Sequence, residues 1–231
     1  MRTAAILPVK SFARAKQRLG ASVPDPLRLQ LARAMVADVL LALAQTESIE
    51  RTIIVTGEQS VAVPARKQGV IVLDDIAESG QSAAAALGAR WALAEGIERV
   101  VCVPGDCPAL DPAELETLLH VSAGALPAQA TVVIVPDRHG TGTNGLLLSP
   151  PDAIAPSFGP DSCERHRALA LAAGVAVSVQ RPSSLLLDID TGSDLAVLRE
   201  RLSGLDARAP RTRSVLGQPE RTSILPLTTP V

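Results

Sequence analysis

A short apolar strand that ends abruptly in Pro-Gly-Asp constrains the fold more than any other stretch of the sequence. The run Val100–Val103 is apolar and β-branched except for Cys102, which is typical of a buried strand. Pro104–Asp106 follow it directly. Because ligands of open α/β sheets bind at the carboxyl ends of the strands, Asp106 is a candidate metal ligand. Alternatively, Asp106 only forms a turn before the next helix.

Strand-like and helix-like segments alternate along most of the chain. Besides the run that precedes Asp106, short apolar stretches predict strands at Thr3–Val9, Arg51–Thr56, Val70–Leu73, Thr131–Val135, Val175–Val179 and Leu185–Leu187. Amphipathic or alanine-rich stretches predict helices at Pro26–Gln45, Ala83–Gly96, Pro112–Val121, Cys163–Ala173 and, from a capping box at Thr191–Asp194, as far as Leu202. This alternation predicts an α/β fold, a three-layer sandwich with a mainly parallel mixed sheet.

Length and composition indicate a single domain of ordinary size. The chain has 231 residues, of which 47% are hydrophobic but only 1% aromatic, so its core must be built from Ala, Val, Leu and Ile. We expect this domain to span residues 1–206. From residue 207 to 231 the sequence is rich in Arg, Pro, Thr and Ser without periodicity, which predicts a disordered tail.

Charge and hydropathy exclude several classes of protein. The formal net charge of −2 argues against a general binder of nucleic acid or membrane surfaces. Neither a secretory signal sequence nor an apolar segment long enough to span a bilayer is found, so a cytoplasmic location is expected. Cys102, Cys107 and Cys163 are odd in number and lack the spacing of a zinc site, which argues against disulfides and zinc. A homodimer is compatible with the sequence, but nothing in it indicates one.

Four cationic side chains follow the first predicted strand, namely Lys10, Arg14, Lys16 and Arg18. A loop of this kind can hold a triphosphate by charge and hydrogen-bond donors even without a P-loop, whose GxxxxGK[ST] pattern is absent here. The alternative is a charged face that only meets solvent.

Three further stretches place glycine and hydroxyl side chains where a ligand could approach the backbone. Gly80 and Ser82 begin the alanine-rich helix, and free N–H groups there suit an anion or the edge of a nucleobase. Gly159 and Ser162 precede a later helix, whose start suits a phosphate or carboxylate. Between them, the run Arg138–Asn144 alternates glycine with threonine, which is more than a hairpin turn needs. Each of the two helix starts could also be a plain N-cap.

Two aspartates follow the last predicted strand. In an extended chain, alternation puts Asp188 and Asp190 on the same side, where two carboxylates can face one cation. Asp190 could instead only orient the following helix, so Asp188 ranks higher. Together with Asp106, these side chains and the cationic and glycine-rich segments describe a Mg²⁺-dependent site for two phosphorylated ligands, since Mg²⁺ prefers few protein carboxylates plus water and phosphate oxygens.

Five segments in this order resemble those of one enzyme family: ILPVKSFARAKQRL, VPGDCPAL, PDRHGTGTN, FGPDSCERH and LDIDTGSDL. They are similar to the guanylyltransferases of coenzyme F-420 biosynthesis, which use phosphoenolpyruvate or 2-phospho-L-lactate. The resemblance covers residues 3 to 202, and GTGT followed by FGPDS is its most specific part. It implies a nucleotidyltransferase fold, GT-A-like and Rossmann-like, with GTP as co-substrate and Mg²⁺ as cofactor.

The resemblance also implies roles for individual residues. The metal ligands would be Asp106, Asp188 and Asp190, and the catalytic residues Lys16 and Asp106. The residues that bind the phosphoenolpyruvate acceptor would be Thr143, Gly159 and Ser162. The nucleotide would be bound by Lys10, Lys16, Arg18, Gly80 and Ser82. Relatives often carry Leu-Asn where this chain has Gln81-Ser82, so the resemblance assigns no guanine contact there.

The implied reaction joins GMP from GTP to the phosphate of phosphoenolpyruvate, giving enolpyruvyl-diphospho-5'-guanosine and pyrophosphate. Transfer of this kind needs positioning and charge neutralisation more than a protein nucleophile. The same reaction with 2-phospho-L-lactate is the alternative, because both acceptors carry one phosphate and one carboxylate. The Ala/Arg-rich, Lys-poor composition is typical of a high-GC bacterium, for which the resemblance implies the phosphoenolpyruvate variant of the family. Further alternatives are a molybdopterin or sugar-phosphate nucleotidyltransferase and an inactive nucleotide-binding module.

Overall fold

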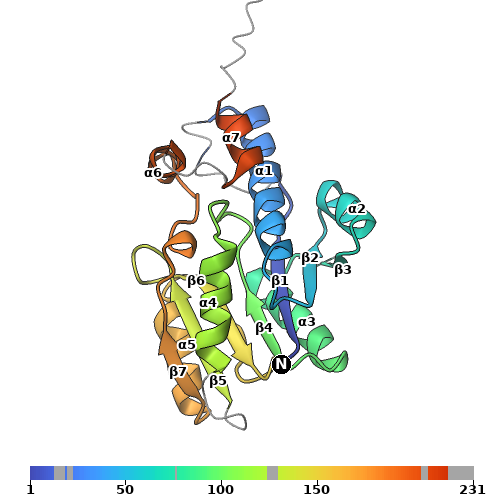
Figure 1. Ribbon diagram of the computed structural model, residues 1–231, viewed down its shortest axis with the longest axis vertical. Coiled ribbons are helices and arrows are strands. Elements are labelled where there is room, and N and C mark those ends of the chain that lie inside the picture. The colour runs from blue at the N-terminus through green and yellow to red at the C-terminus, as the bar shows by residue number, and fades with distance from the viewer. Residues whose placement is uncertain (13–18, 20–22, 76, 124–129, 204–207, 218–231) are drawn as a thin grey trace, which may run out of the picture.

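The centre of the molecule is a mixed β-sheet (Figure 1). The structure is a computed structural model that describes residues 1–12, 19, 23–75, 77–123, 130–203 and 208–217. Seven strands follow the order β3-β2-β1-β4-β6-β5-β7. They are β1 (Thr3–Val9), β2 (Arg51–Thr56), β3 (Ile71–Asp74), β4 (Arg99–Cys102), β5 (Thr131–Pro136), β6 (Thr143–Ser149) and β7 (Ala176–Val179). Strand β6 is antiparallel to β4 and β5, whereas all other neighbours are parallel. The expected mainly parallel mixed sheet is confirmed.

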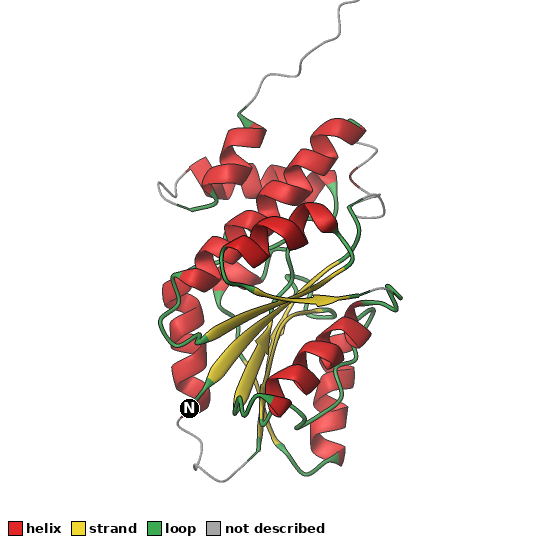
Figure 2. Cartoon of the chain, turned by 90° about the vertical axis from the view of Figure 1, so that its right-hand side faces the viewer, coloured by secondary structure: helices red, strands yellow, loops and turns green. Residues whose placement is uncertain are grey.

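Helices cover both faces of this sheet and complete three layers (Figure 2). One face is covered by α1 (Asp25–Ala44), α2 (Gln59–Lys67) and α4 (Pro112–Ala123). The other is covered by α3 (Gln81–Ala94) and α5 (Ser162–Ala172). Two last helices, α6 (Gly192–Ser203) and α7 (Pro210–Leu216), join α1 in a third apolar cluster beyond the sheet.

Strand β1 shows why the sheet needs helices on both faces. Ala5 and Leu7 face one helical layer, whereas Ala4 and Ile6 face the other, and none of the four is exposed to solvent. Alternation along the strand therefore sends apolar side chains into two cores. Helix α3 approaches so closely that a Cβ on Gly88 would lie 2.7 Å from Ile6, so small residues on this helix set the spacing between helix and sheet.

The expected disordered tail is wrong for α7. This helix packs against α1, and its Thr212 is fully buried. Its N-cap residue, Ala209, has no side-chain acceptor, and Asp38 of α1 takes that role by accepting from the backbone N–H groups of Arg211 (3.1 Å) and Thr212 (2.8 Å). A cap supplied from a distant helix cannot be seen in local sequence. The folded part thus extends past residue 206, while residues 218–231 lie outside those described.

One further expectation is wrong, and two elements of the structure were not expected. The apolar run Leu185–Leu187 is no strand, because Ser183–Leu185 forms a 3-10 turn and the carbonyl of Leu185 accepts from the side chain of Asn144 (2.9 Å) rather than from a ladder. Helix α2 was not expected, since Pro64 interrupts its pattern. Strand β6 was not expected either, because Asn and Gly near its start are poor strand formers.

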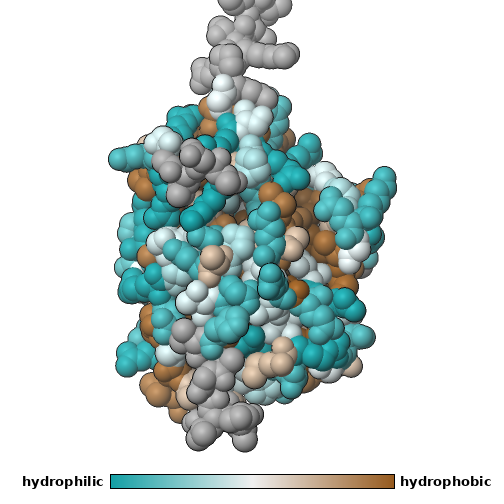
Figure 3. Space-filling view, in the orientation of Figure 1, coloured by the Kyte–Doolittle hydropathy of each residue, from teal (hydrophilic) through white to brown (hydrophobic). Residues whose placement is uncertain are grey.

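The surface offers no large apolar face in the view of Figure 3, which is mostly hydrophilic with scattered apolar residues. The large exposed apolar side chains of the described residues lie on different elements, such as Val63 on α2, Leu171 on α5 and Val197 on α6. Within the same part of the chain, no helix has both the length and the apolar character needed to cross a membrane.

Candidate active site

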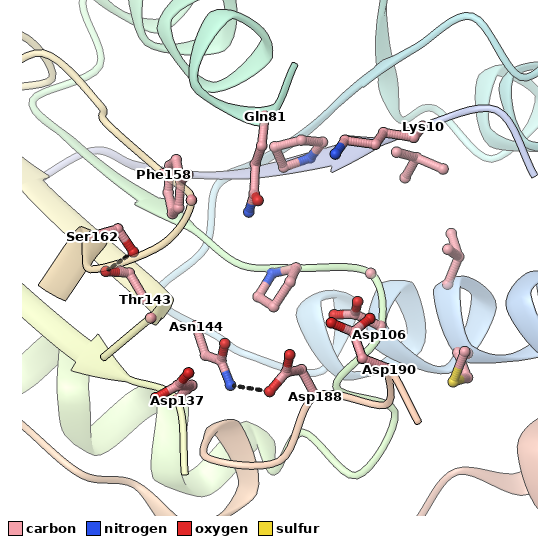
Figure 4. Close-up of a pocket in the computed structure, with 18 of the residues that line it drawn as sticks. Lys10, Gln81, Asp106, Asp137, Thr143, Asn144, Phe158, Ser162, Asp188 and Asp190 are labelled. Carbon is pink, nitrogen blue, oxygen red and sulfur yellow. Dashed lines mark hydrogen bonds between the residues drawn. The ribbon is translucent and has the colours of Figure 1, made fainter. Parts of the chain in front are cut away.

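A pocket of about 620 Å³ lies at the carboxyl ends of β1 and β4, the edge of the sheet at which the sequence predicts ligands (Figure 4). Its walls also include the first residues of β6, the N-termini of α3 and α5, and the segment that precedes α6. Antiparallel β6 begins at the same edge at which β1 and β4 end, so its first side chains enter the pocket too.

Three aspartates form one side of the pocket, with Lys10 and Gln81 on the opposite side (Figure 4). Asp106 follows β4, whereas Asp188 and Asp190 belong to the segment before α6. A backbone hydrogen bond from Ile189 N–H to the carbonyl of Asp106 (3.1 Å) holds the two segments together. The sequence therefore correctly placed these carboxylates at one edge, although Asp188 and Asp190 do not follow a strand.

The carboxylate of Asp188 sits in surroundings that oppose its charge. Burial and, after it, the neighbouring carboxylate of Asp106 raise the pKa of Asp188 above its usual value. A hydrogen bond from Asn144 Nδ2 (3.2 Å) acts in the opposite direction and lowers this pKa, and Asp190 raises it slightly. Crowded carboxylates of this kind are relieved when a cation binds between them.

Sequence reasoning missed Asn144 as an individual site residue. Its side chain is buried, and its Nδ2 donates both to Asp188 Oδ1 and to the carbonyl of Leu185 (2.9 Å). Asn144 thereby ties the start of β6 to the segment that carries Asp188. The only sign of Asn144 in the sequence was its position at the end of the glycine- and threonine-rich run Arg138–Asn144. Asp137, which precedes this run, also lines the pocket and accepts from the N–H of Thr141 (3.0 Å).

Thr143 and Ser162 lie together in the pocket wall formed by β6 and α5. Ser162 Oγ donates to Thr143 Oγ1 (3.0 Å), as the dashed line in Figure 4 shows. A third side chain, the fully buried His166 of α5, contacts Thr143 Oγ1 through its Nδ1 (3.1 Å). His166 is the second site residue that the sequence did not single out, although the motif FGPDSCERH contains it.

The loop before α5 contributes Gly159 and Pro160 to the same wall. Gly159 lines the pocket with a φ of 118°, a conformation that glycine adopts without strain. The guanidinium of Arg165 fastens this loop by donating to the carbonyls of Ser157 (3.2 Å) and Pro160 (2.9 Å). The N-terminus of α5 therefore faces the pocket and suits an anionic group of a ligand.

The residues expected to bind the nucleotide fall into three groups, according to where the structure places them. Lys10 lines the pocket. Lys16 and Arg18 lie outside the described residues. At the N-terminus of α3, the pocket lining includes Gln81 but neither Gly80 nor Ser82, whose Oγ accepts from the N–H of Phe158 (2.8 Å). It is thus the side chain of Gln81 that this helix presents to a ligand.

The carboxylate oxygens of the pocket suit a cation that is also coordinated by a bound ligand. Among the described residues, no group of three or more His, Cys, Asp or Glu side chains is close enough to enclose a metal ion by itself. The carboxylates of the pocket are nevertheless hard oxygen ligands, which suit Mg²⁺ when water and phosphate oxygens complete its coordination. A pocket with carboxylates on one side and a lysine and a helix N-terminus elsewhere can hold a phosphorylated ligand.

Comparison with known protein families agrees with this site. The family model "Guanylyl transferase CofC like" matches residues 3–209, which is most of the chain. The chain belongs to the CofC-like guanylyl transferase family. The family resemblance inferred from the motifs is thereby confirmed, and the enzyme class with it.

Two relatives of this CofC-like protein illustrate the family. The phosphoenolpyruvate guanylyltransferase of Conexibacter woesei is 47% identical over 96% of this chain and 99% of its own length. The 2-phospho-L-lactate guanylyltransferase of Methanothermobacter thermautotrophicus is 33% identical over 90% of this chain and 89% of its own length. A solved structure of a nucleotidyl transferase from the same organism matches with a TM-score of 0.63 at 18% identity, covering 87% of this chain and 98% of that one. The CofC-like chain therefore has the nucleotidyltransferase fold that the sequence predicts.

Proposed function

We propose that this enzyme transfers GMP from GTP to the phosphate of phosphoenolpyruvate, giving enolpyruvyl-diphospho-5'-guanosine and pyrophosphate, as a step in coenzyme F-420 biosynthesis. The observation that carries the proposal is the near full-length match, at 47% identity, to a phosphoenolpyruvate guanylyltransferase. The pocket supports it, because its carboxylates, its lysine and its helix N-terminus suit two phosphorylated ligands and a cation.

The acceptor is proposed to bind at the wall formed by Thr143, Gly159 and Ser162. The hydroxyl pair can donate a hydrogen bond to its phosphate or carboxylate, and the positive N-terminal end of α5 favours an anionic group. The triphosphate of GTP is assigned to the side of Lys10, with Lys16 and Arg18 as further candidate ligands in the segment that follows it. At the N-terminus of α3, we assign the contact with the nucleotide to Gln81, which lines the pocket, rather than to Gly80 and Ser82.

The proposed metal ligands are Asp106, Asp188 and Asp190, which offer carboxylate oxygens on one side of the pocket. Bound Mg²⁺ would neutralise phosphate charge and help to orient the reacting groups. An oxygen of the acceptor phosphate attacks the α-phosphorus of GTP, and the bond from this phosphorus to the leaving pyrophosphate breaks. Because the attacking oxygen is already anionic, the side chains position the reactants, and no general base is required.

Release of pyrophosphate by the purified protein tests the proposal. GTP and Mg²⁺ are supplied with phosphoenolpyruvate or with 2-phospho-L-lactate, and a reaction without acceptor is the control. We expect release with phosphoenolpyruvate. Release with 2-phospho-L-lactate alone would replace the acceptor by that of the 33% identical relative. Release with neither acceptor would contradict the proposed function and favour another nucleotidyltransferase or a nucleotide-binding module.

A further inference from the structure

His166 is a buried side chain that does not line the pocket itself. It contacts Thr143, one of the residues proposed to bind phosphoenolpyruvate. Its Nε2 lies 2.8 Å from the backbone nitrogen of Ser157, and its Nδ1 lies 3.1 Å from Thr143 Oγ1. The ring also meets Phe158 edge to face, with the ring centroids 5.1 Å apart. Both ring nitrogens are therefore engaged, and the imidazole cannot turn without losing these contacts.

The contacts decide which nitrogen of His166 carries the proton. A backbone N–H can only donate, so Nε2 must accept from Ser157 and cannot itself be protonated. Burial and, after it, the charge of Arg165 lower the pKa of His166 to about 4, so the ring is neutral at neutral pH. Its single N–H is then on Nδ1 and must donate to Thr143 Oγ1.

The position of this proton determines which hydrogen bonds the hydroxyl groups of Thr143 and Ser162 can make. A hydroxyl has two acceptor positions and one hydrogen to donate. Thr143 Oγ1 accepts from His166 Nδ1 and from Ser162 Oγ, which fills both positions. The Thr143 side chain makes no further hydrogen bond within the described residues, so its hydrogen is available to the pocket that it lines. If the two hydroxyls exchange roles when a ligand binds, the available hydrogen is that of Ser162.

We propose that His166 is a positioning residue for the acceptor site, because it makes the Thr143–Ser162 pair a donor toward an anionic ligand. The opposite tautomer would accept from Thr143, whose hydroxyl would accept from Ser162, and no hydrogen would remain for the ligand. The proposal rests on the proposed function for the identity of that ligand, phosphoenolpyruvate. The assignment of the proton rests only on the contacts of the imidazole.

The first test reads the imidazole directly, by nuclear magnetic resonance of protein labelled with ¹⁵N-histidine. The chain has only three histidines, and the other two, His120 and His139, are exposed, so the variants His120→Asn and His139→Asn assign the signals by elimination. We expect the His166 ring at neutral pH to be neutral and protonated on Nδ1. Protonation on Nε2, or a doubly protonated ring, would overturn the proposal. No substrate is needed, so failure of the proposed function leaves this test intact.

The second test separates positioning from structural support by kinetics. His166→Phe keeps a planar ring but cannot donate, whereas the amide of His166→Asn can still donate at the position of Nδ1. We expect His166→Phe to raise the KM for phosphoenolpyruvate roughly three- to tenfold, the effect of one lost hydrogen bond. The KM for GTP should stay unchanged, and His166→Asn should recover part of the loss.

A double-mutant cycle with Thr143→Val decides whether His166 acts through Thr143. In the Thr143→Val background the hydroxyl is already gone, so adding His166→Phe should raise the acceptor KM no further. An equal additional increase in that background, or parallel increases in the KM for both substrates, would contradict the proposal and indicate a structural role. If His166→Phe does not fold, the spectrum of the wild-type protein still confirms or refutes the assigned proton position.

Discussion

At the scale of single residues, Asp188 carries a charge that lowers the free energy of unfolding and that the proposed function requires. It is half-buried beside Asp106, and both factors raise its pKa. The folded protein therefore holds this proton more tightly than the unfolded chain does. Between the two pKa values the folded state binds more protons, so the contribution of Asp188 to the free energy of unfolding falls as the pH rises through that window. At neutral pH its charge is a cost to folding, which a bound cation would remove.

Replacement of Asp188 by Asn should separate activity from stability. We expect turnover to fall by about a hundredfold or more, because a proposed metal ligand is lost. The free energy of unfolding at pH 7 in EDTA should stay equal or rise, since a half-buried charge is removed while the amide oxygen still accepts from Asn144. Denaturant unfolding across acidic and neutral pH measures this, and the free energy of unfolding of the variant should rise relative to that of the wild type as the pH increases.

The matched control for this variant is Asp152→Asn, which changes an exposed aspartate that does not line the pocket. It should alter neither turnover nor the pH dependence of unfolding. If Asp188→Asn destabilised the protein strongly at neutral pH, the carboxylate would have to be a stabilising group, contrary to its raised pKa.

The sequence predicted several pocket residues that have a local signature, and it missed two whose role depends on a contact with a distant part of the chain. Asp106 and Ser162 were accessible because turns and helix starts have local signatures. Asn144 and His166 owe their roles to Leu185 and Thr143, which lie 41 and 23 residues away in the sequence. Without an alignment or a structure, nothing near either residue indicates which distant group it meets.

At the scale of secondary-structure elements, local patterns predicted most strands and helices but not which other parts of the chain they contact. The run at β1 was predicted because it is apolar, and those at β2 and β5 because they are also β-branched; the core needs such side chains on both faces. The run at Leu185–Leu187 is equally apolar but packs as a turn against two cores. Burial explains its composition, and period alone cannot tell a buried turn from a strand.

Helix α7 depends on a hydrogen-bond acceptor from another helix, α1. Asp38 accepts from two N–H groups at the start of α7 and is itself almost fully buried. We expect Asp38→Ala to lower the free energy of unfolding by about 1–2 kcal/mol, the cost of a lost N-cap. Asp38→Asn should lose less, because its amide oxygen can still accept one of the two hydrogen bonds.

Hydrogen exchange would show where the stability is lost. The amides of α7 should exchange faster in Asp38→Ala, whereas those of the central strands should follow only the change in global stability. Asp152→Asn again serves as the control. Unchanged exchange in α7 would mean that its apolar contacts with α1, rather than the cap, hold the helix in place.

At the scale of the whole molecule, one pocket joins segments from distant parts of the chain. Its wall combines the ends of β1 and β4, the starts of β6 and α5, and the segment between the 3-10 turn and α6. The order of strands explains this, because placing antiparallel β6 beside β4 brings the start of one to the end of the other. A ligand that spans the pocket therefore contacts both the early and the late part of the chain and should stabilise the folded state as a unit.

This linkage predicts that GTP stabilises the protein and that Mg²⁺ is required for most of the effect. At a ligand concentration about a hundredfold above its Kd, the folded state gains about 2.7 kcal/mol, which should raise the midpoint of thermal unfolding by several degrees. EDTA should abolish most of the increase, because the triphosphate would then face Asp106, Asp188 and Asp190 without a cation to offset their charge. Asp106→Asn should lose the Mg²⁺-dependent part and unfold near the wild-type midpoint when no ligand is present. An equal increase with GTP in EDTA and in Mg²⁺ would instead show that Lys10 and the helix N-termini bind the nucleotide alone, and that the aspartates have another role.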